Sequence, residues 1–230
     1  MKSKVTTGTS GIIFDMDGVI SDTQDLHAEI ESSVLKRFGI NLSPDEITAR
    51  FAGVGDKVMF STLFSEHGVK IASFDDLVTE KWGLMAQAVA SHGVKPIAYS
   101  LELIELLSQY GFVLSVASGS PRAFIAQVIE TFSLQKYFVC CVSGEEVRHG
   151  KPAPDIFLEA AKLMGLDYDR CAVIEDGLSG MQAAARAGMG CIGLVKDLDK
   201  KYPASVLVTS LREVTPELAL SVMGSLAPLQ

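Results

Sequence analysis

Short apolar runs rich in β-branched residues alternate with amphipathic segments along most of the chain. Each run has the length and composition of a buried β-strand, and four of them end abruptly in polar residues. Helix-like segments separate the last three of these four runs, an arrangement that predicts right-handed βαβ units and a parallel sheet. The four runs, followed by two more that predict outer strands, occupy residues 11–14, 112–117, 137–142, 171–174, 191–195 and 206–208.

Between residues 23 and 94 the alternation of strands and helices gives way to helices alone. Ser43, Pro44 and Glu46 stand in the order of an N-cap, a first-turn proline and a capping box, so a helix is expected to begin there. The sequence therefore predicts an α/β protein with a doubly wound, Rossmann-like parallel-sheet core. Residues 1–22 and 95–230 would form this core, and residues 23–94 would form a small all-helical cap inserted after the first strand.

Two serines of the predicted core are expected to cap helices. Ser120 precedes Pro121 in the preferred order of an N-cap and a first-turn proline, and Ser179 precedes its reciprocal partner Gln182. The alanine-rich helix after Ser179 is expected to stop at Gly188. Its small residues suit close packing on the sheet.

The balance of charges excludes several classes of partner. The net charge is −8, from 20 basic and 28 acidic residues, and no cluster of Lys and Arg supplies the positive surface that nucleic-acid binding requires. No apolar stretch has the length of a membrane-spanning helix. Lys2 and Lys4 are followed by the polar residues 6–10, where a signal peptide needs an apolar segment. We expect a cytoplasmic protein with a loose N-terminal tail, a monomer or weak dimer that binds neither nucleic acid nor membrane.

The polar residues at the strand ends carry the candidate chemistry, because ligands bind outside the carboxyl ends of parallel strands. Two like charges about 4 Å apart repel by roughly 4 kcal/mol at an effective dielectric near 20, so a cluster of carboxylates needs a cation. Oxygen ligands without histidine or thiolate favour a hard ion, and Mg²⁺ is the usual one where phosphate is bound. The residues concerned are Asp15, Asp17, Ser118, Gly119, Lys151, Glu175 and Asp176.

These groups together predict in-line phosphoryl transfer to a carboxylate, with a small phosphorylated metabolite as substrate. Asp15 would attack phosphorus and form an aspartyl phosphate. Asp17 would protonate the leaving oxygen and later accept a proton from water. Ser118 would donate a hydrogen bond to a phosphoryl oxygen. Lys151 would hold the phosphoryl group or neutralise the nucleophile, and together with Mg²⁺ would offset the charge of the equatorial oxygens.

The order and spacing of these residues resemble the haloacid dehalogenase superfamily, specifically its helical-cap branch with β-phosphoglucomutase and many small-molecule phosphatases. The resemblance implies that Asp15, the main-chain carbonyl of Asp17 and Asp176 bind Mg²⁺, with Glu175 close by. Superfamily members that cleave carbon–halogen bonds or phosphonates lack an acid at the position of Asp17, so its presence favours phosphate esters. The four matching motifs lie at residues 15–23, 118–120, 151–155 and 175–180.

The sequence leaves open whether the reaction is hydrolysis or isomerisation. His27 occupies the place of a hinge histidine found in β-phosphoglucomutase, and it is either catalytic or a helix-start histidine half-packed at the hinge. Similar mutases hold a second phosphate with a lysine and an arginine, where this chain has Ala52 and Asp56. An aspartate does not suit a bisphosphate, although neighbouring cations could compensate. Those cations are Arg50, Lys57 and Arg122.

The first hypothesis is therefore a Mg²⁺-dependent phosphatase of small phosphate monoesters, with sugar phosphates as candidates. The alternative is a phosphomutase similar to β-phosphoglucomutase. A hypothesis of another class is a non-catalytic protein of the same fold that binds a phosphorylated ligand.

Overall fold

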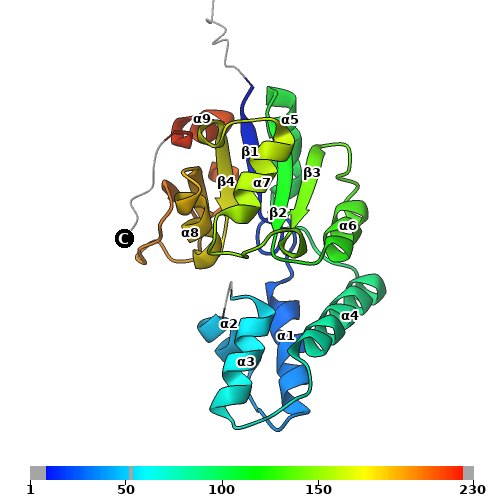
Figure 1. The fold of residues 1–230 in the computed structure, drawn as a ribbon. Coiled ribbons are helices and arrows are strands. Elements are labelled where there is room, and N and C mark those ends of the chain that lie inside the picture. The colour runs from blue at the N-terminus through cyan, green and yellow to red at the C-terminus, as the bar shows by residue number, and fades with distance from the viewer. Residues whose placement is uncertain (1–8, 52–53, 225–230) are drawn as a thin grey trace, which may run out of the picture.

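The computed structural model describes residues 9–51 and 54–224, and its centre is a twisted sheet of parallel strands (Figure 1). Six strands lie within these ranges, in the spatial order β3-β2-β1-β4-β5-β6. This is the doubly wound α/β core expected from the sequence. The strands are β1 (Gly11–Phe14), β2 (Val113–Ser118), β3 (Phe138–Ser143), β4 (Cys171–Glu175), β5 (Gly190–Leu194) and β6 (Val206–Val208).

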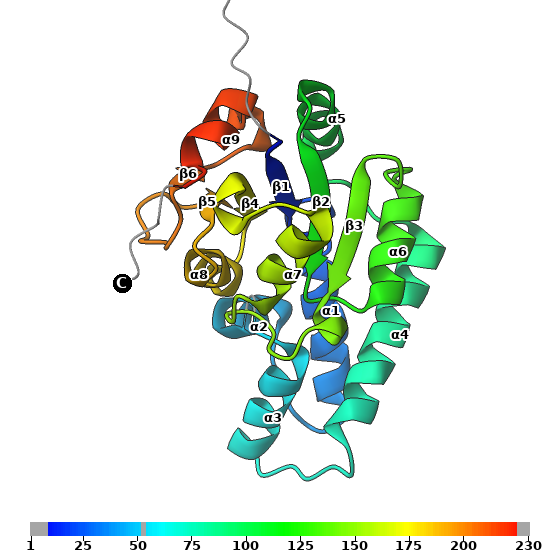
Figure 2. The ribbon, with the colours of Figure 1, turned by 45° about the horizontal axis from the view of Figure 1, so that its top comes forward.

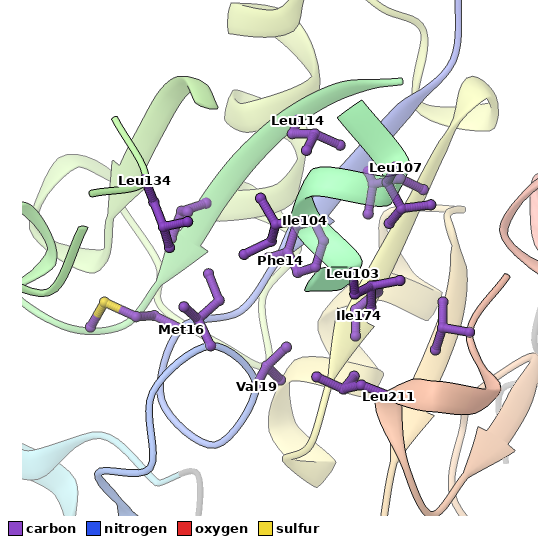
Figure 3. Close-up of a cluster of buried hydrophobic side chains, with 14 of the residues drawn as sticks. Phe14, Met16, Val19, Leu103, Ile104, Leu107, Leu114, Leu134, Ile174 and Leu211 are labelled. Atoms are coloured by element: carbon purple, nitrogen blue, oxygen red, sulfur yellow. The ribbon is translucent and has the colours of Figure 1, made fainter. Parts of the chain in front are cut away.

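Helices cover both faces of the sheet because the strands are buried on both sides. In β1 the side chains alternate: Phe14 belongs to the hydrophobic cluster of one face, which Figure 3 shows together with Ile104 and Leu107, whereas Ile13 belongs to the cluster of the other. The first face is covered by α5 (Ser100–Tyr110), α6 (Arg122–Thr131) and α9 (Pro216–Val222), and the second by α7 (Asp155–Met164) and α8 (Leu178–Arg186).

Four helices lie between β1 and α5, and Figure 1 shows them beyond the edge at which the strands end. They are α1 (Gln24–Lys36), α2 (Pro44–Phe51), α3 (Asp56–Glu66) and α4 (Phe74–His92), which we call the cap helices. Their apolar residues form a hydrophobic cluster of their own around Phe60 and Phe64. The division into a core and a cap domain at residues 22 and 95 stays a prediction.

Helix α4 also packs on the core. Met85 and Val89 belong to the hydrophobic cluster that contains Phe124 and Val128 of α6, and Figure 2 shows the two helices next to each other. The ring of Trp82 lies 5.1 Å from that of Phe124. The cap helices are therefore attached to the core through buried apolar contacts as well as through the chain.

The expected helix termini are confirmed in part. Ser43 and Glu46 form the predicted capping box at the start of α2. Ser120 does not cap α6, because that helix begins at Arg122 with Pro121 as its N-cap; the hydroxyl of Ser120 instead donates to the carboxylate of Asp17. Ser179 lies inside α8, whose N-cap is Gly177, because that helix begins one residue before Ser179.

Three further expectations concern the end of α8, membrane spans and two segments that the structure does not describe. Helix α8 ends before Gly188, as expected, and this glycine has the left-handed φ of +72° typical of a helix end. Among the described residues, no helix is both long and apolar enough to span a membrane. The expected loose tail and Ala52 of the cap loop lie outside the described residues.

Candidate active site

The carboxyl ends of β1, β2 and β4 lie side by side at one edge of the sheet. Phe14 of β1 pairs with Val116 of β2 on one side and with Ile174 of β4 on the other. Each strand therefore delivers its next polar residue to the same place. These residues are Asp15 after β1, Ser118 at the end of β2, and Glu175 with Asp176 at the end of β4.

Lys151 reaches this edge from the segment before α7 and contacts two of the acids. Its Nζ lies 2.6 Å from Oδ1 of Asp15 and 2.8 Å from Oε1 of Glu175. Burial alone would lower the pKa of Lys151, but the charges of the two carboxylates outweigh it and raise that pKa above its usual value. Lys151 is thus a permanent positive charge between Asp15 and Glu175 of β4.

Three carboxylates gather around this single cation. One oxygen each of Asp15, Glu175 and Asp176 lies within 4.8 Å of the others. Burial, reinforced by the repulsion from Glu175, raises the pKa of Asp15 to about 7 and that of Asp176 well above its usual value. This excess of buried acid fits a hard divalent cation, because oxygen donors of this kind are the preferred ligands of Mg²⁺.

The fourth predicted ligand, Asp17, contributes its main chain on this side. Its carbonyl oxygen and Oδ2 of Asp176 face the same amide, since Nε2 of Gln24 lies 3.4 Å from the first and 3.2 Å from the second. The residues that the sequence assigned to Mg²⁺ are therefore gathered in one place. Asp15, Asp17, Glu175 and Asp176 fit the ion in the type of their donor atoms.

Two glycines make room for the acids. Gly18 has a φ of +86°, and a Cβ at this position would lie 2.0 Å from Oδ2 of Asp176. A Cβ at Gly180 of α8 would lie 1.6 Å from Oε1 of Glu175. Side chains at these two positions would displace the carboxylates, so the acidic cluster depends on both glycines.

The carboxylate of Asp17 faces a ring of hydrogen-bond donors. Oγ of Ser120 and Oγ1 of Thr23 both lie 2.5 Å from its oxygens, and Oγ of Ser118 lies 3.2 Å away. Nε2 of His27 lies 3.6 Å from Oδ1. Burial would raise the pKa of Asp17, but these donors together hold it well below its usual range. Asp17 is therefore a carboxylate in this arrangement, oriented by both the core and the cap helices.

The most buried charged group of the cap helices is Lys81, which the sequence analysis missed. Its Nζ lies 2.8 Å from Nδ1 of His27, 2.8 Å from Asp56 and 3.2 Å from Glu31, over the face of Trp82. A signal existed in the sequence, because position 81 falls in the apolar i, i+4 stripe of α4 between Leu77 and Met85. A lysine inside such a stripe must find buried partners.

The remaining predicted residues have other neighbours. Gly119 is exposed directly after Ser118 at the strand edge. Arg50 pairs with Glu66 at 2.8 Å and lies over the ring of Phe51. Arg122 pairs with Glu146 at 2.7 Å. In the described part of the chain neither arginine forms a hydrogen bond or ion pair with the acidic cluster, and their role in binding substrate stays a prediction.

Comparison with known proteins agrees with this geometry. Residues 12–194 match the model of the family described as haloacid dehalogenase-like hydrolase. The Escherichia coli (strain K12) protein named fructose-1-phosphate phosphatase YqaB is 32% identical over 189 residues, which are 80% of this chain and 95% of that protein. The Thermotoga maritima phosphorylated carbohydrates phosphatase is 29% identical over 215 residues, 92% of this chain and 97% of that protein.

Other matches differ in how much of the matched protein this chain covers. The Arabidopsis thaliana protein SUPPRESSOR OF QUENCHING 1, chloroplastic, is 30% identical over 83% of this chain, but the match spans only 18% of that protein's length. A crystal structure of a HAD hydrolase, family IA, variant 3 from Entamoeba histolytica has the same fold, with a TM-score of 0.81 and 24% identity over 94% of this chain and 99% of that one.

Proposed function

The chain belongs to the haloacid dehalogenase-like hydrolases, and from this premise we propose that it hydrolyses small phosphate monoesters through an aspartyl phosphate on Asp15. The observation that carries the proposal is the convergence of Lys151 on Asp15 and Glu175, with Asp176 beside them, although Asp15 lies 136 positions from Lys151 in the chain. A buried carboxylate next to a fixed ammonium and a site suited to a divalent cation is an activated nucleophile for an anionic phosphorus centre.

Each residue of the site has a task in this reaction. The carboxylate of Asp15 attacks phosphorus, and Lys151 holds it in place while offsetting the charge of the phosphoryl oxygens. Mg²⁺, held by Asp15, the carbonyl of Asp17 and Asp176, would supply further positive charge to those oxygens. Asp17 is a carboxylate in the free protein, and it must take up a proton when the anionic phosphoryl group binds beside it, because that negative charge favours the protonated form. It then gives this proton to the leaving oxygen and takes one from the water that hydrolyses the phosphoenzyme. Ser118 turns its hydroxyl from Asp17 to a phosphoryl oxygen.

The charges around the cap loop support hydrolysis over a mutase reaction. A mutase that retains a bisphosphate needs free cations for the second phosphate, but the three cations that could serve are engaged in ion pairs. Lys81 is fully buried and shared between His27 and two acids. The three pairs are Arg50 with Glu66, Lys57 with Asp75, and Arg122 with Glu146.

The relatives support sugar phosphates as the substrate class. Two of them carry names of phosphatases that act on fructose 1-phosphate and on phosphorylated carbohydrates. In both cases the match to this chain spans nearly the whole length of the relative. A neutral polyol would not need a free cation on the cap side, where the buried Lys81 is already shared by Glu31 and Asp56, since hydroxyl groups hydrogen-bond without adding charge. We therefore place the substrate among small monophosphorylated sugars and polyols.

A panel of phosphate esters assayed with Mg²⁺ and with EDTA tests the proposal. Free phosphate should appear from sugar monophosphates only with the ion, and Asp15→Asn should abolish it. A hexose 1-phosphate separates hydrolysis from isomerisation, because a mutase would convert it into the 6-phosphate instead of releasing phosphate. Binding of these esters without turnover by the unaltered chain would point to a non-catalytic binding protein and sink the proposal.

A further inference from the structure

Gln24, the first residue of α1, connects the cap helices to the acidic cluster. Its Nε2 lies 3.2 Å from Oδ2 of Asp176, 152 positions away in the chain, and 3.4 Å from the carbonyl oxygen of Asp17. Gln24 is therefore next to two of the groups assigned to Mg²⁺ and reaches them from outside the sheet.

The other acids of the cluster are held by the core. Lys151 fixes Asp15 and one oxygen of Glu175, and the main-chain N–H of Gly177 donates to the other oxygen of Glu175 at 2.6 Å. Oδ2 of Asp176 instead lies between the amide of Gln24 and the bare Cα of Gly18. Its orientation thus depends on a residue of α1.

An amide is suited to this place in a way that a cation is not. It donates a hydrogen bond that stabilises the buried carboxylate of Asp176, yet it adds no charge that would compete with a divalent ion. Residues that orient metal ligands by hydrogen bonds typically change metal affinity or activity 10–100-fold when they are replaced.

We propose that Gln24 is a positioning residue of the metal site, which holds the carboxylate of Asp176 in the orientation it has within the acidic cluster. This inference rests on the proposed function, because it assigns Gln24 to the ion of that reaction. Its consequence is that part of the affinity for Mg²⁺ is supplied by the first turn of α1.

The test measures thermal unfolding against Mg²⁺ concentration, without substrate. Gln24→Met keeps the length of the side chain and removes its donor, and the midpoint of stabilisation by Mg²⁺ should rise about 10-fold or more. Gln109→Met is the matched control, since Gln109 also donates to a carboxylate, that of Glu105 at 3.1 Å, but on the exposed face of α5. Its midpoint should equal that of the unaltered protein.

A purely structural role for Gln24 would lower the unfolding temperature equally with and without Mg²⁺ and leave the midpoint unchanged, whereas the positioning role raises the midpoint and allows high Mg²⁺ to restore turnover. Gln24→Lys is a second variant, whose ammonium would compete with the ion and raise the midpoint at least as much. If both variants keep the normal midpoint while the protein binds Mg²⁺ and hydrolyses esters, the inference is wrong and the proposed function stands. If the unaltered protein is not stabilised by Mg²⁺, both are wrong.

Discussion

Nζ of Lys81 lies 2.8 Å from Nδ1 of His27. An ammonium has protons to donate and no lone pair, so Nδ1 must be the acceptor and the proton of the imidazole must sit on Nε2. Nε2 is the atom that faces Oδ1 of Asp17 at 3.6 Å. The buried lysine of α4 thus determines the tautomer that turns an N–H toward the proposed acid and base of the reaction.

Replacing this lysine should slow the chemical step. In Lys81→Met the imidazole loses the donor that fixes its tautomer, and we expect kcat to fall about 10-fold or more, with a smaller change in KM, because the proton transfer assigned to Asp17 is worth about 10²–10⁴. Glu31 and Asp56 also lose their shared cation, and removing one partner of a buried pair costs about 3–5 kcal/mol. Steady-state kinetics below the unfolding temperature and urea denaturation measure the two effects.

The control for this variant is Lys57→Met, because Lys57 also lies in the cap helices and pairs with Asp75 at 2.8 Å, but on the surface. Its stability should change by less than about 1 kcal/mol. The role assigned to Lys81 requires that its replacement has little further effect on kcat once His27 has been changed to alanine. Equal losses of kcat in both backgrounds would contradict it.

Asp17→Asn should separate the two halves of the reaction. The variant keeps most of the shape of the side chain but cannot transfer a proton, so turnover of a sugar phosphate should fall by about 10²–10⁴. p-Nitrophenyl phosphate has a leaving group that needs no proton, and its first step should remain fast. Rapid mixing should therefore show a burst of one p-nitrophenolate per enzyme, followed by slow hydrolysis. Unchanged steady-state turnover would contradict the role of Asp17.

Stability without metal should depend on pH through the acidic cluster. Burial raises the pKa of Asp15 from 3.8 to about 7, and it also raises that of Asp176. Between pH 3.8 and about 7 the folded protein binds more protons than the unfolded chain. The free energy of unfolding should therefore fall as the pH rises through this interval. The measurement is urea denaturation in EDTA from pH 5 to 7.5.

Two comparisons check the origin of that slope. Asp15→Asn should flatten it, whereas Asp75→Asn, which changes an exposed carboxylate of α4, should leave it as it is. Saturating Mg²⁺ should also flatten it, since the ion stabilises the charged form of the same acids. Asp176 should retain part of the slope, but a slope as steep as that of the unaltered protein after Asp15→Asn in EDTA would mean that groups other than Asp15 produce it.

The acids at the strand ends could be predicted because a parallel sheet brings the carboxyl ends of its strands to one edge. Asp15, Lys151 and Asp176 follow from this rule, however long the chain between these positions is. The ion pairs of the cap helices could not be predicted in this way, because they depend on how separate helices cross. Lys81 and Asp56 meet across α4 and α3, and neither position shows its partner in the sequence.

Ser120 illustrates a second limit. Its place before Pro121 is typical of a helix N-cap, and local sequence alone favours that role. In the folded protein the helix begins at Arg122 with Pro121 as its N-cap, and the hydroxyl of Ser120 donates to the carboxylate of Asp17, 103 positions away. Tertiary contacts thus converted an expected structural serine into a neighbour of the candidate active site.

The same substitution at two helical glycines should have opposite effects. In Gly180→Ala the new Cβ would lie 1.6 Å from Oε1 of Glu175, the atom that accepts from Lys151, so this carboxylate must move. We expect lower stability, by about 1–3 kcal/mol as in other overpacked cores, together with weaker stabilisation by Mg²⁺ and slower release of phosphate. In Gly83→Ala of α4 the Cβ meets nothing within 4 Å.

Gly83→Ala should therefore stabilise the protein by about 0.5–1 kcal/mol, because alanine restricts the unfolded chain and favours the helix. Urea denaturation of the two variants, each with and without Mg²⁺, distinguishes the effect of helix propensity from that of the site. The difference in sign is the decisive quantity, since propensity alone would make both variants more stable. Stabilisation by Gly180→Ala with normal phosphate release would show that Glu175 can leave Lys151 without consequence, and the arrangement of the acids around this lysine would then not be required for activity.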